Sequence, residues 1–187
     1  MRAFIALPMP EAAIEPLLQL QSRLPKGRPV PEENLHLTVA FLGDQPERAL
    51  EAVHEELLTL RHGTISIELA GAAFFGGQHG QALGLEVDGG PGLRDLYDRV
   101  VSRVRGAGIT LERRRFRPHV TVARLPRGAE PGAALATLSA AQIGPVSLTE
   151  LALVSSTLRE DGALHEVLAS YPLGPNLNGM QGHGPIW

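Results

Sequence analysis

Short segments in which apolar residues alternate with polar ones, or run together, recur along the chain between glycine, proline and aspartate residues. Such segments predict β-strands, because successive side chains of a strand point to opposite faces. Residues 2–7, 35–42 and 116–125 show the pattern most clearly. The other predicted strands cover residues 64–69, 82–87, 145–154 and 164–170.

Between these segments, apolar residues recur at intervals of three and four, which predicts helices with one buried face. The clearest helix spans about residues 93–104, and the others lie at about 11–24, 46–60 and 131–140. Strands outnumber helices and alternate with them. The sequence therefore predicts an α+β fold with largely antiparallel sheets.

The chain of 187 residues suits one compact domain. We expect this domain over residues 1–174 and a flexible C-terminal tail over 175–187, which is rich in glycine, proline and asparagine. Cysteine is absent, which removes disulfides, thiolate nucleophiles and thiolate metal ligands. No apolar run reaches the roughly 20 residues that cross a bilayer, and the N-terminus does not read as a secretory signal. These features favour a cytoplasmic protein that binds no membrane.

The formal net charge of −3 is unevenly distributed along the chain. Residues 99–127 hold nine arginines and one acid, Glu112, so this stretch carries +8 and the rest of the chain carries −11. A basic stretch on an acidic chain favours an anionic ligand over general coating of nucleic acid. An arginine-rich solvated surface would have the same composition, so charge alone leaves both interpretations open.

Two similar tetrapeptides lie in predicted strands 83 residues apart: His36-Leu37-Thr38-Val39 and His119-Val120-Thr121-Val122. Side chains at positions i and i+2 of a strand share a face, so each motif presents an imidazole and a hydroxyl together. The apolar residues of each motif face the other way. Repetition of the unit in both halves predicts a pseudo-symmetric pair of lobes with two His-x-Thr pairs facing each other across a cleft.

This arrangement suits phosphoryl chemistry. Hydrolysis of a phosphodiester without a metal needs a base that takes a proton from water and an acid that protonates the departing oxygen. Histidine, whose ordinary pKa is about 6.5, can act either way near neutral pH, and threonine hydroxyls can donate hydrogen bonds to phosphate oxygens. The candidate catalytic residues are therefore His36 and His119, with Thr38 and Thr121 as substrate-binding residues.

Other interpretations of these motifs stay open at this point. Threonine and valine are ordinary strand residues, and a single His-x-Thr occurs often by chance. Paired histidines can also bind a metal, but neither copy has the His-Glu-x-x-His spacing or an obvious carboxylate partner, so we expect no metal and no cofactor. The remaining histidines have no repeated context: His54, His62, His79, His165 and His183.

Five segments of the chain form a longer ordered pattern: Arg2–Leu7, Asn34–Gly43, Phe116–Arg124, Leu151–Ser156 and Gly162–Leu173. On these segments the chain resembles the two-histidine (2H) phosphoesterases, and most of all their RNA 2′,3′-cyclic phosphodiesterase branch, also called the 2′-5′ RNA ligase family. The resemblance covers nearly the whole chain and is far more specific than a single His-x-Thr. One departure is visible after the glycine of the last segment, where relatives often have an aromatic residue and this chain has Ala-Leu-His, ending at His165.

The resemblance implies a bilobal, pseudo-two-fold fold with two mostly antiparallel sheets, helices on the outside, and a central cleft lined by the His-x-Thr motifs. It implies that one histidine activates water while the other protonates the departing 3′ oxygen, and we assign His119 as the base and His36 as the acid. It also places Arg124 near the nucleotide phosphate and Phe41 near the base or sugar. Strict alternation puts these two residues on the face opposite the histidines, so they would reach the cleft only if the strands twist or end there.

The function implied by the resemblance is hydrolysis of RNA 2′,3′-cyclic phosphate ends to 2′-phosphate ends, and reversal of 2′-5′ cleavage would appear as RNA ligation. The expected partners are RNA 3′ ends or small cyclic nucleotides, with no obligatory protein partner and a monomeric state. One alternative keeps the site but changes the substrate, for example to a linear 2′-5′ linkage. Another is a non-catalytic protein that binds RNA ends or cyclic nucleotides.

Overall fold

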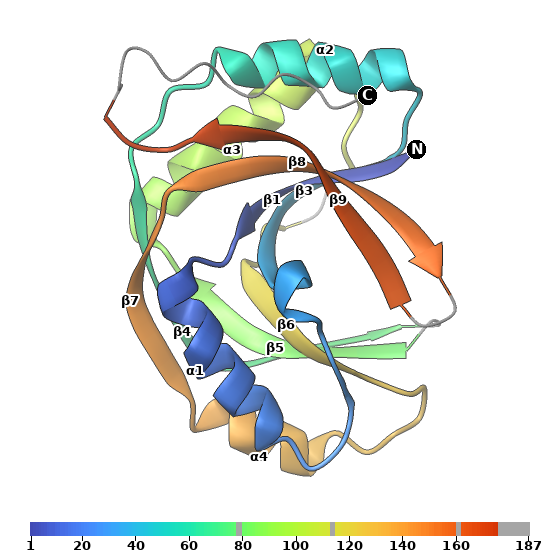
Figure 1. Cartoon of the computed structure of the whole chain (residues 1–187), viewed down its shortest axis with the longest axis vertical. Helices are drawn as coiled ribbons and strands as arrows, with labels where there is room; N and C mark the ends of the chain where they lie inside the picture. The colour runs from blue at the N-terminus through green and yellow to red at the C-terminus, as the bar shows by residue number, and fades with distance from the viewer. Residues whose placement is uncertain (78–79, 113–114, 160–161, 176–187) are drawn as a thin grey trace.

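The computed structural model describes residues 1–77, 80–112, 115–159 and 162–175, and shows a strongly curved antiparallel sheet with helices on its outer side (Figure 1). None of the described helices is both long and apolar enough to cross a bilayer. The strands are β1 (Arg2–Pro8), β2 (Arg28–Pro29), β3 (His36–Asp44), β4 (Ile65–Gly77), β5 (Gly80–Asp88), β6 (His119–Leu125), β7 (Gln142–Leu148), β8 (Glu150–Arg159) and β9 (Gly162–Pro172). The helices are α1 (Glu11–Ser22), α2 (Glu47–Leu58), α3 (Gly90–Gly106) and α4 (Gly132–Ser139), with a 3-10 turn η1 (Glu32–Asn34).

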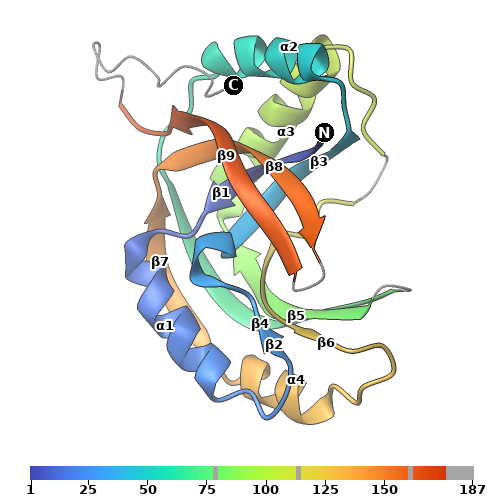
Figure 2. The same cartoon turned by 45° about the vertical axis from the view of Figure 1, so that its right-hand side comes forward.

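The α+β class predicted from the sequence is confirmed, and the sheet has the order β7-β4-β5-β6-β3-β1-β8-β9, with β2 beside β6. Every strand pair is antiparallel in the part of the chain that the structure describes. The sheet consists of two halves that meet between β3 and β6, where a single residue pair, Leu37 with Val120, joins them. The two expected sheets are therefore linked edge to edge. One hairpin from each half, β8–β9 and β4–β5, extends toward the same side of the molecule (Figure 2).

The two halves of the chain repeat one order of elements. The first contributes β1, α1, β3 and α2, and the second contributes β5, α3, β6 and α4, with a His-x-Thr motif at the start of β3 and of β6. The helices pack crosswise, because α1 contacts β6 and β7 whereas α3 contacts β3 and α2. This reciprocal exchange gives the bilobal, pseudo-two-fold arrangement that the sequence predicted.

The helices and the outer face of the sheet enclose the main hydrophobic core. Leu93, Leu96 and Val100 of α3 are at most 2% exposed, as the helical spacing predicted. Leu37 and Val120, between the histidine and threonine of their motifs, are 0% exposed and belong to the same core. Burial of one such side chain contributes about 1.5–3 kcal/mol. This burial fixes which face each motif strand turns toward the helices, and it leaves the histidines on the other face.

Three segments differ from the sequence-based prediction. The predicted strand 64–69 continues as β4 to Gly77, because its pairing with β5 extends to the pair Gly77 and Gly80 despite the many glycines and alanines between. The predicted strand 145–154 is two strands, β7 and β8, separated at Thr149. β7 includes Pro145 because it lies at an edge of the sheet, where proline is tolerated. The short strand β2 was not predicted at all, since two residues give no pattern. His79, His183 and residues 176–187 of the expected tail lie outside the described residues.

Candidate active site

The two His-x-Thr motifs meet at the junction of the two halves. The single residue pair that joins β3 to β6 is the middle residue of each motif. Continuation of this antiparallel register places His36 beside Thr121 and His119 beside Thr38, all on the face away from the helices. Each histidine therefore has the hydroxyl of its own motif on its strand and that of the other motif across the junction.

His36 is fixed by two hydrogen bonds. Its Nδ1 lies 2.6 Å from the carbonyl oxygen of Asn34, and its Nε2 lies 3.0 Å from Oγ1 of Thr38. A carbonyl oxygen only accepts hydrogen bonds, so Nδ1 carries the hydrogen. In the neutral ring Nε2 is then free to accept the hydroxyl hydrogen of Thr38 or a proton.

His119 repeats this arrangement in the other half. Its Nδ1 lies 2.8 Å from the carbonyl oxygen of Arg117, again two residues earlier in the chain. Its Nε2 is therefore also the nitrogen left for chemistry. Among the hydrogen bonds of the described residues, none joins His119 to Thr121. The two imidazoles thus share one tautomer and one mode of attachment, but only His36 is bonded to the threonine of its own motif.

Each histidine ring also lies against a phenylalanine from a neighbouring part of the sheet. The ring of Phe4 in β1 is stacked on His36, with centroids 4.9 Å apart. The ring of Phe75 in β4 lies 4.1 Å from that of His119, and the guanidinium of Arg117 is 5.0 Å from the centroid of Phe75. Sequence reasoning missed both rings, because nothing in the local pattern links either phenylalanine to a histidine so distant along the chain.

A β-bulge in β3 turns Phe41 to the face that carries His36. Against β1, Ala40 pairs with Ile5 whereas Thr38 pairs with Ala6, so β3 has one extra residue between the two pairs. After such a bulge the alternation of faces is reversed. The side chain of Phe41 is accordingly 63% exposed. Its ring centroid lies 6.2 Å from that of Phe4, beside the site.

The same bulge occurs at the equivalent place in β6. Against β5, Ala123 pairs with Leu83 whereas Thr121 pairs with Gly84, so β6 also has one extra residue. Both motif strands show two consecutive buried positions followed by an exposed one, which is Arg124 in β6. The prediction from strict alternation, that this arginine and its counterpart in β3 face away from the histidines, is wrong because of these bulges.

Burial shifts the proton affinity of His36 strongly. Desolvation is the largest effect and lowers the pKa of His36 from 6.5 to about 4. The hydrogen bond to the Asn34 carbonyl acts in the opposite direction, whereas the charges of His165, His119 and Arg124 lower the pKa further. These electrostatic effects also indicate that Arg124 reaches the histidines from the second half of the sheet.

Burial also lowers the pKa of His119 below its ordinary value. The bond to the Arg117 carbonyl raises this pKa, and the positive charge of the same arginine lowers it. In the free protein at pH 7 both imidazoles are therefore neutral. Either can accept a proton, and the one that donates must first gain a proton when an anion binds.

A third imidazole, that of His165 in β9, lies beside His36. The two ring centroids are 5.4 Å apart and the rings meet edge to face. This histidine has no repeated context in the sequence, and the one signal for it was the departure from the family pattern at this position. Its placement follows from β9 lying over the start of β3, which the local sequence does not reveal.

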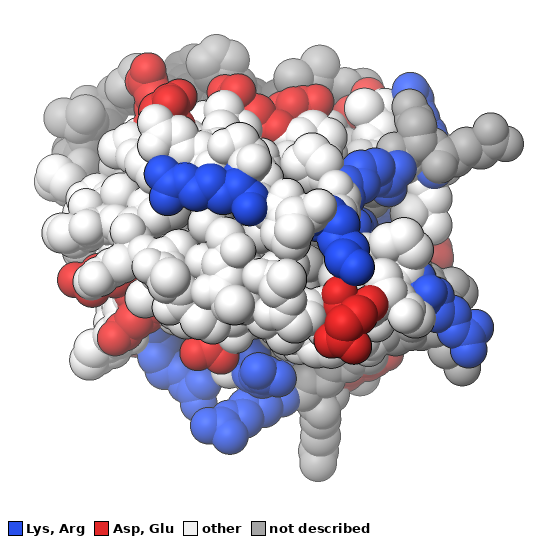
Figure 3. Space-filling view, turned by 90° about the horizontal axis from the view of Figure 1, so that it is seen from below, with Lys and Arg blue, Asp and Glu red and all other residues white. Residues whose placement is uncertain are grey.

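The arginine-rich stretch 99–127 does not form one surface in its described part, which leaves out Arg113 and Arg114. Arg99, Arg103 and Arg105 lie on α3, on the helical side of the sheet, whereas Arg117 and Arg124 lie at the histidine face. In the view from below, basic side chains form separate groups with acidic ones between them (Figure 3). The part of the stretch relevant to an anionic ligand is therefore the part beside β6.

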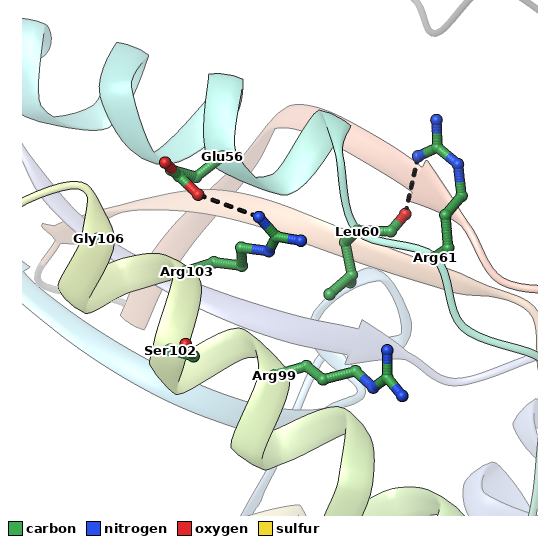
Figure 4. Close-up of a pocket in the computed structure, with 7 residues that line it drawn as sticks. All are labelled: Glu56, Leu60, Arg61, Arg99, Ser102, Arg103 and Gly106. Atoms are coloured by element: carbon green, nitrogen blue, oxygen red, sulfur yellow. Dashed lines mark hydrogen bonds and ion pairs between the residues drawn. The ribbon is translucent and has the colours of Figure 1, made fainter.

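A cavity of about 330 Å³ lies between α2 and α3, and no residue of the His-x-Thr motifs lines it (Figure 4). Two of its three arginines are paired with carboxylates: Arg103 lies 3.3 Å from Glu56, and Arg99 lies 2.6 Å from Asp95. The third, Arg61, donates hydrogen bonds to the carbonyl oxygens of Leu58 and Leu60. The cavity is therefore not part of the candidate site. Its lining consists of Glu56, Leu60, Arg61, Arg99, Ser102, Arg103 and Gly106. Among the described residues, no group of three or more histidine or acidic side chains is arranged to hold a metal ion.

Solved structures share this fold. A Thermus thermophilus protein matches with a TM-score of 0.76 and 24% identity, covering 94% of this chain and all of that one. Escherichia coli LigT without ligand matches with a TM-score of 0.72 and 24% identity, covering 93% of this chain and 98% of that one.

Sequence comparisons identify the family. An RNA 2′,3′-cyclic phosphodiesterase of Aeropyrum pernix is 32% identical over 145 residues, which cover 74% of this chain and 82% of the relative. An enzyme of the same name from Geobacillus stearothermophilus is 31% identical over 194 residues, covering 97% of this chain and 60% of the relative. Residues 8–160, which include both His-x-Thr motifs, match the 2′-5′ RNA ligase superfamily. The chain therefore belongs to the 2′-5′ RNA ligase superfamily of two-histidine phosphoesterases.

Proposed function

We propose that this protein hydrolyses 2′,3′-cyclic phosphate ends on RNA to 2′-phosphate ends, by acid–base catalysis between His36 and His119 without a metal. The observation that carries the proposal is the matched attachment of the two imidazoles. Each donates its Nδ1 hydrogen to the carbonyl two residues earlier and leaves Nε2 on the shared face. The curated relatives named above are RNA 2′,3′-cyclic phosphodiesterases, and one LigT structure is a complex with 3′-AMP.

The reaction needs one proton acceptor and one proton donor. His119 takes a proton from water at Nε2, and the water oxygen attacks phosphorus on the side opposite the 3′ oxygen. As the bond from phosphorus to the 3′ oxygen breaks, His36 gives its Nε2 proton to that oxygen. The bond to the 2′ oxygen stays, so the products are a 3′-hydroxyl and a 2′-phosphate. Exchange of protons with solvent then returns both rings to their starting states.

For His36 to act as the acid, its pKa must rise when the substrate binds. Burial keeps this ring neutral in the free protein, with a pKa of about 4. A bound phosphate adds a negative charge beside the ring, which favours the protonated form. Binding of the substrate therefore draws in a proton, and the acid is formed only in the complex.

The remaining site residues hold the phosphate and the nucleoside. The hydroxyls of Thr38 and Thr121 donate hydrogen bonds to the non-bridging oxygens, and the guanidinium of Arg124 neutralises part of their charge. The exposed ring of Phe41 offers an apolar surface for the terminal base or sugar. We further propose that the protein acts as a cytoplasmic monomer on RNA 3′ ends, that residues 1–174 form its single domain, and that reversal of 2′-5′ cleavage gives weak RNA ligation.

The test uses a short RNA with a labelled 5′ end and a 2′,3′-cyclic phosphate, incubated in excess chelator. Mass spectrometry distinguishes the opened end from the cyclic end, and a phosphatase that removes 3′-monoesters but not 2′-monoesters distinguishes the two possible opened ends. Wild type should give a 2′-phosphate, and His36→Ala and His119→Ala should each lose most of the activity while they keep the same thermal unfolding. His62→Gln is the matched control, since His62 pairs with Asp95 on α3 at 3.3 Å and takes no part in the site.

A non-catalytic RNA-end binder would behave differently. It would bind the cyclic end and release it unchanged, and its affinity would change with pH in one direction only. Acid–base catalysis instead gives a bell-shaped pH dependence of the rate. Recovery of intact cyclic ends from the wild type, or full activity in both alanine variants, would contradict the proposal.

A further inference from the structure

His165 lies against the two rings that define the first half of the site. Its centroid is 5.4 Å from that of His36 and 5.0 Å from that of Phe4, and it meets both rings edge to face. The residue is partly exposed to solvent. His165 belongs to neither His-x-Thr motif, and the hydrolysis described above does not use it.

The chain holds this part of β9 in place over the start of β3. The side-chain amide of Asn34 donates a hydrogen bond to the carbonyl oxygen of Ala163 at 3.0 Å. A Cβ atom on Gly162 would come within 3.6 Å of the guanidinium of Arg28, so β9 also reaches β2 in the other half. His165 therefore lies on a strand that contacts both halves of the sheet next to the site.

The groups that face His165 are cationic or neutral. The ring of His36 on β3 lies beside it. Burial is the largest effect and lowers the pKa of His165, and the charges of Arg124 on β6 and Arg2 on β1 lower it further. Glu166 is the next residue of β9 and is exposed, pointing away from this face by strand alternation. Among the described residues, no carboxylate forms an ion pair with His165. Because the two arginines oppose its protonation, His165 gains a proton readily only when an anion binds beside it.

We propose that His165 is a third phosphate-binding residue, which becomes protonated in the complex and donates a hydrogen bond to a phosphate oxygen of the RNA end beside His36. This inference rests on the proposed function, because it names a further contact in the same site. The chemical class of its ligand is a phosphate ester at a nucleotide 2′ or 3′ position. The 2′-phosphate product takes a second negative charge above about pH 6, whereas the cyclic diester has one charge only. His165 therefore holds the product more tightly than the substrate.

The probe is a dinucleotide that ends in a 2′-phosphate, with inorganic phosphate as a second probe. Calorimetry at pH 7 in two buffers of different ionisation heat gives both the affinity and the number of protons taken up. His165→Phe keeps a ring against Phe4 but removes the donor, and we expect about tenfold weaker binding and lower proton uptake than in wild type. His165→Lys supplies a charge that needs no proton uptake, so at pH 8 it should bind at least as tightly as wild type.

Equal affinity and equal proton uptake in wild type and His165→Phe would show that the ring only packs, and would overturn the inference. So would a wild type that binds neither probe. Thermal unfolding of each variant checks that the fold is kept. Hydrolysis of the cyclic RNA end is measured in parallel, so that a wild type that binds phosphate through His165 but leaves the cyclic end intact would refute the proposed function and not this contact.

Discussion

The two halves of the active site share one strand geometry but differ in their surroundings. His36 is bonded to Thr38, stacked on Phe4 and flanked by His165, and its pKa falls to about 4. His119 lies against Phe75, a ring of the β4–β5 hairpin that Arg117 also approaches. Its pKa is lowered as well, but by a smaller amount.

The difference shows how a repeated motif acquires two roles. The tetrapeptides fix the position and the tautomer of each imidazole in the same way. The proton affinity differs because the surroundings differ. Burial lowers the pKa of both rings most; the charges of His165 in β9 and Arg124 in β6 lower that of His36 further, whereas Arg117 lowers that of His119. An acid and a base can therefore come from the same local sequence.

The largest effect should come from removal of the histidines. Acid–base transfer is worth roughly 10²–10⁴-fold, so His36→Ala and His119→Ala should each lower the single-turnover rate by that order. If the halves act as one unit, the double variant should be about as slow as the slower single variant. Rates on the labelled cyclic RNA measure this, and a double variant whose losses multiply would mean that each half works independently.

The second-largest effect should be a loss of stability caused by a substitution at the contact between β5 and β6, in the His119 half. A Cβ at Gly84 would lie 2.2 Å from the carbonyl oxygen of Val120, so Gly84→Ala forces β5 away from the bulge in β6. We expect a loss of about 1–3 kcal/mol in the free energy of unfolding, measured by urea denaturation. Gly63→Ala is the control, since nothing lies within 4 Å of that Cβ position. Equal stability of the two variants would show that the β5–β6 contact is not tight.

A third prediction compares the pH optimum of the free protein, measured by kcat/KM, with that of the substrate complex, measured by kcat. Burial lowers the pKa of both histidines in the free protein, so kcat/KM should be greatest below pH 6.5. The bound phosphate raises the pKa of the acid, so kcat should have its optimum at a higher pH. Initial rates from pH 4.5 to 8.5 at low and at saturating RNA test this. Coincident optima would mean that the phosphate does not change the proton affinity of His36.

The smallest expected effect is on how the stability of the protein changes with pH. Between pH 4 and 6.5 the unfolded chain binds more protons at position 36 than the folded protein, so the free energy of unfolding rises with pH across this window. The contribution is complete above pH 6.5 and is lost as the pH falls to 4. His36→Gln should lose less stability than wild type when the pH falls from 7 to 4.5, and His119→Gln should differ less from wild type. Thermal unfolding at both pH values would contradict this if all three proteins changed equally.

The residues of the motifs could be predicted because their information is local. A histidine and a threonine two positions apart on a strand share a face wherever the strand lies. The helical face of α3 was equally predictable from its spacing. The bulges were not, because Val39-Ala40 and Val122-Ala123 are apolar pairs that do not show which residue is the extra one. The charged Arg124 after the second pair was the one local sign that the alternation reverses there. Phe75 and His165 were missed because their places depend on pairing between strands far apart in the chain.

The paired bulges also determine which mutations the site can tolerate. Deletion of one residue between Thr38 and Phe41 would put Phe41 two positions after Thr38, so a strand without a bulge would keep both side chains on the histidine face. The same holds between Thr121 and Arg124. At the present length, however, a strand that lost its bulge would turn Phe41 or Arg124 toward the core. The extra residue and the bulge therefore compensate each other: the site keeps its face when both are present or both are absent, and loses it when only one of them is changed.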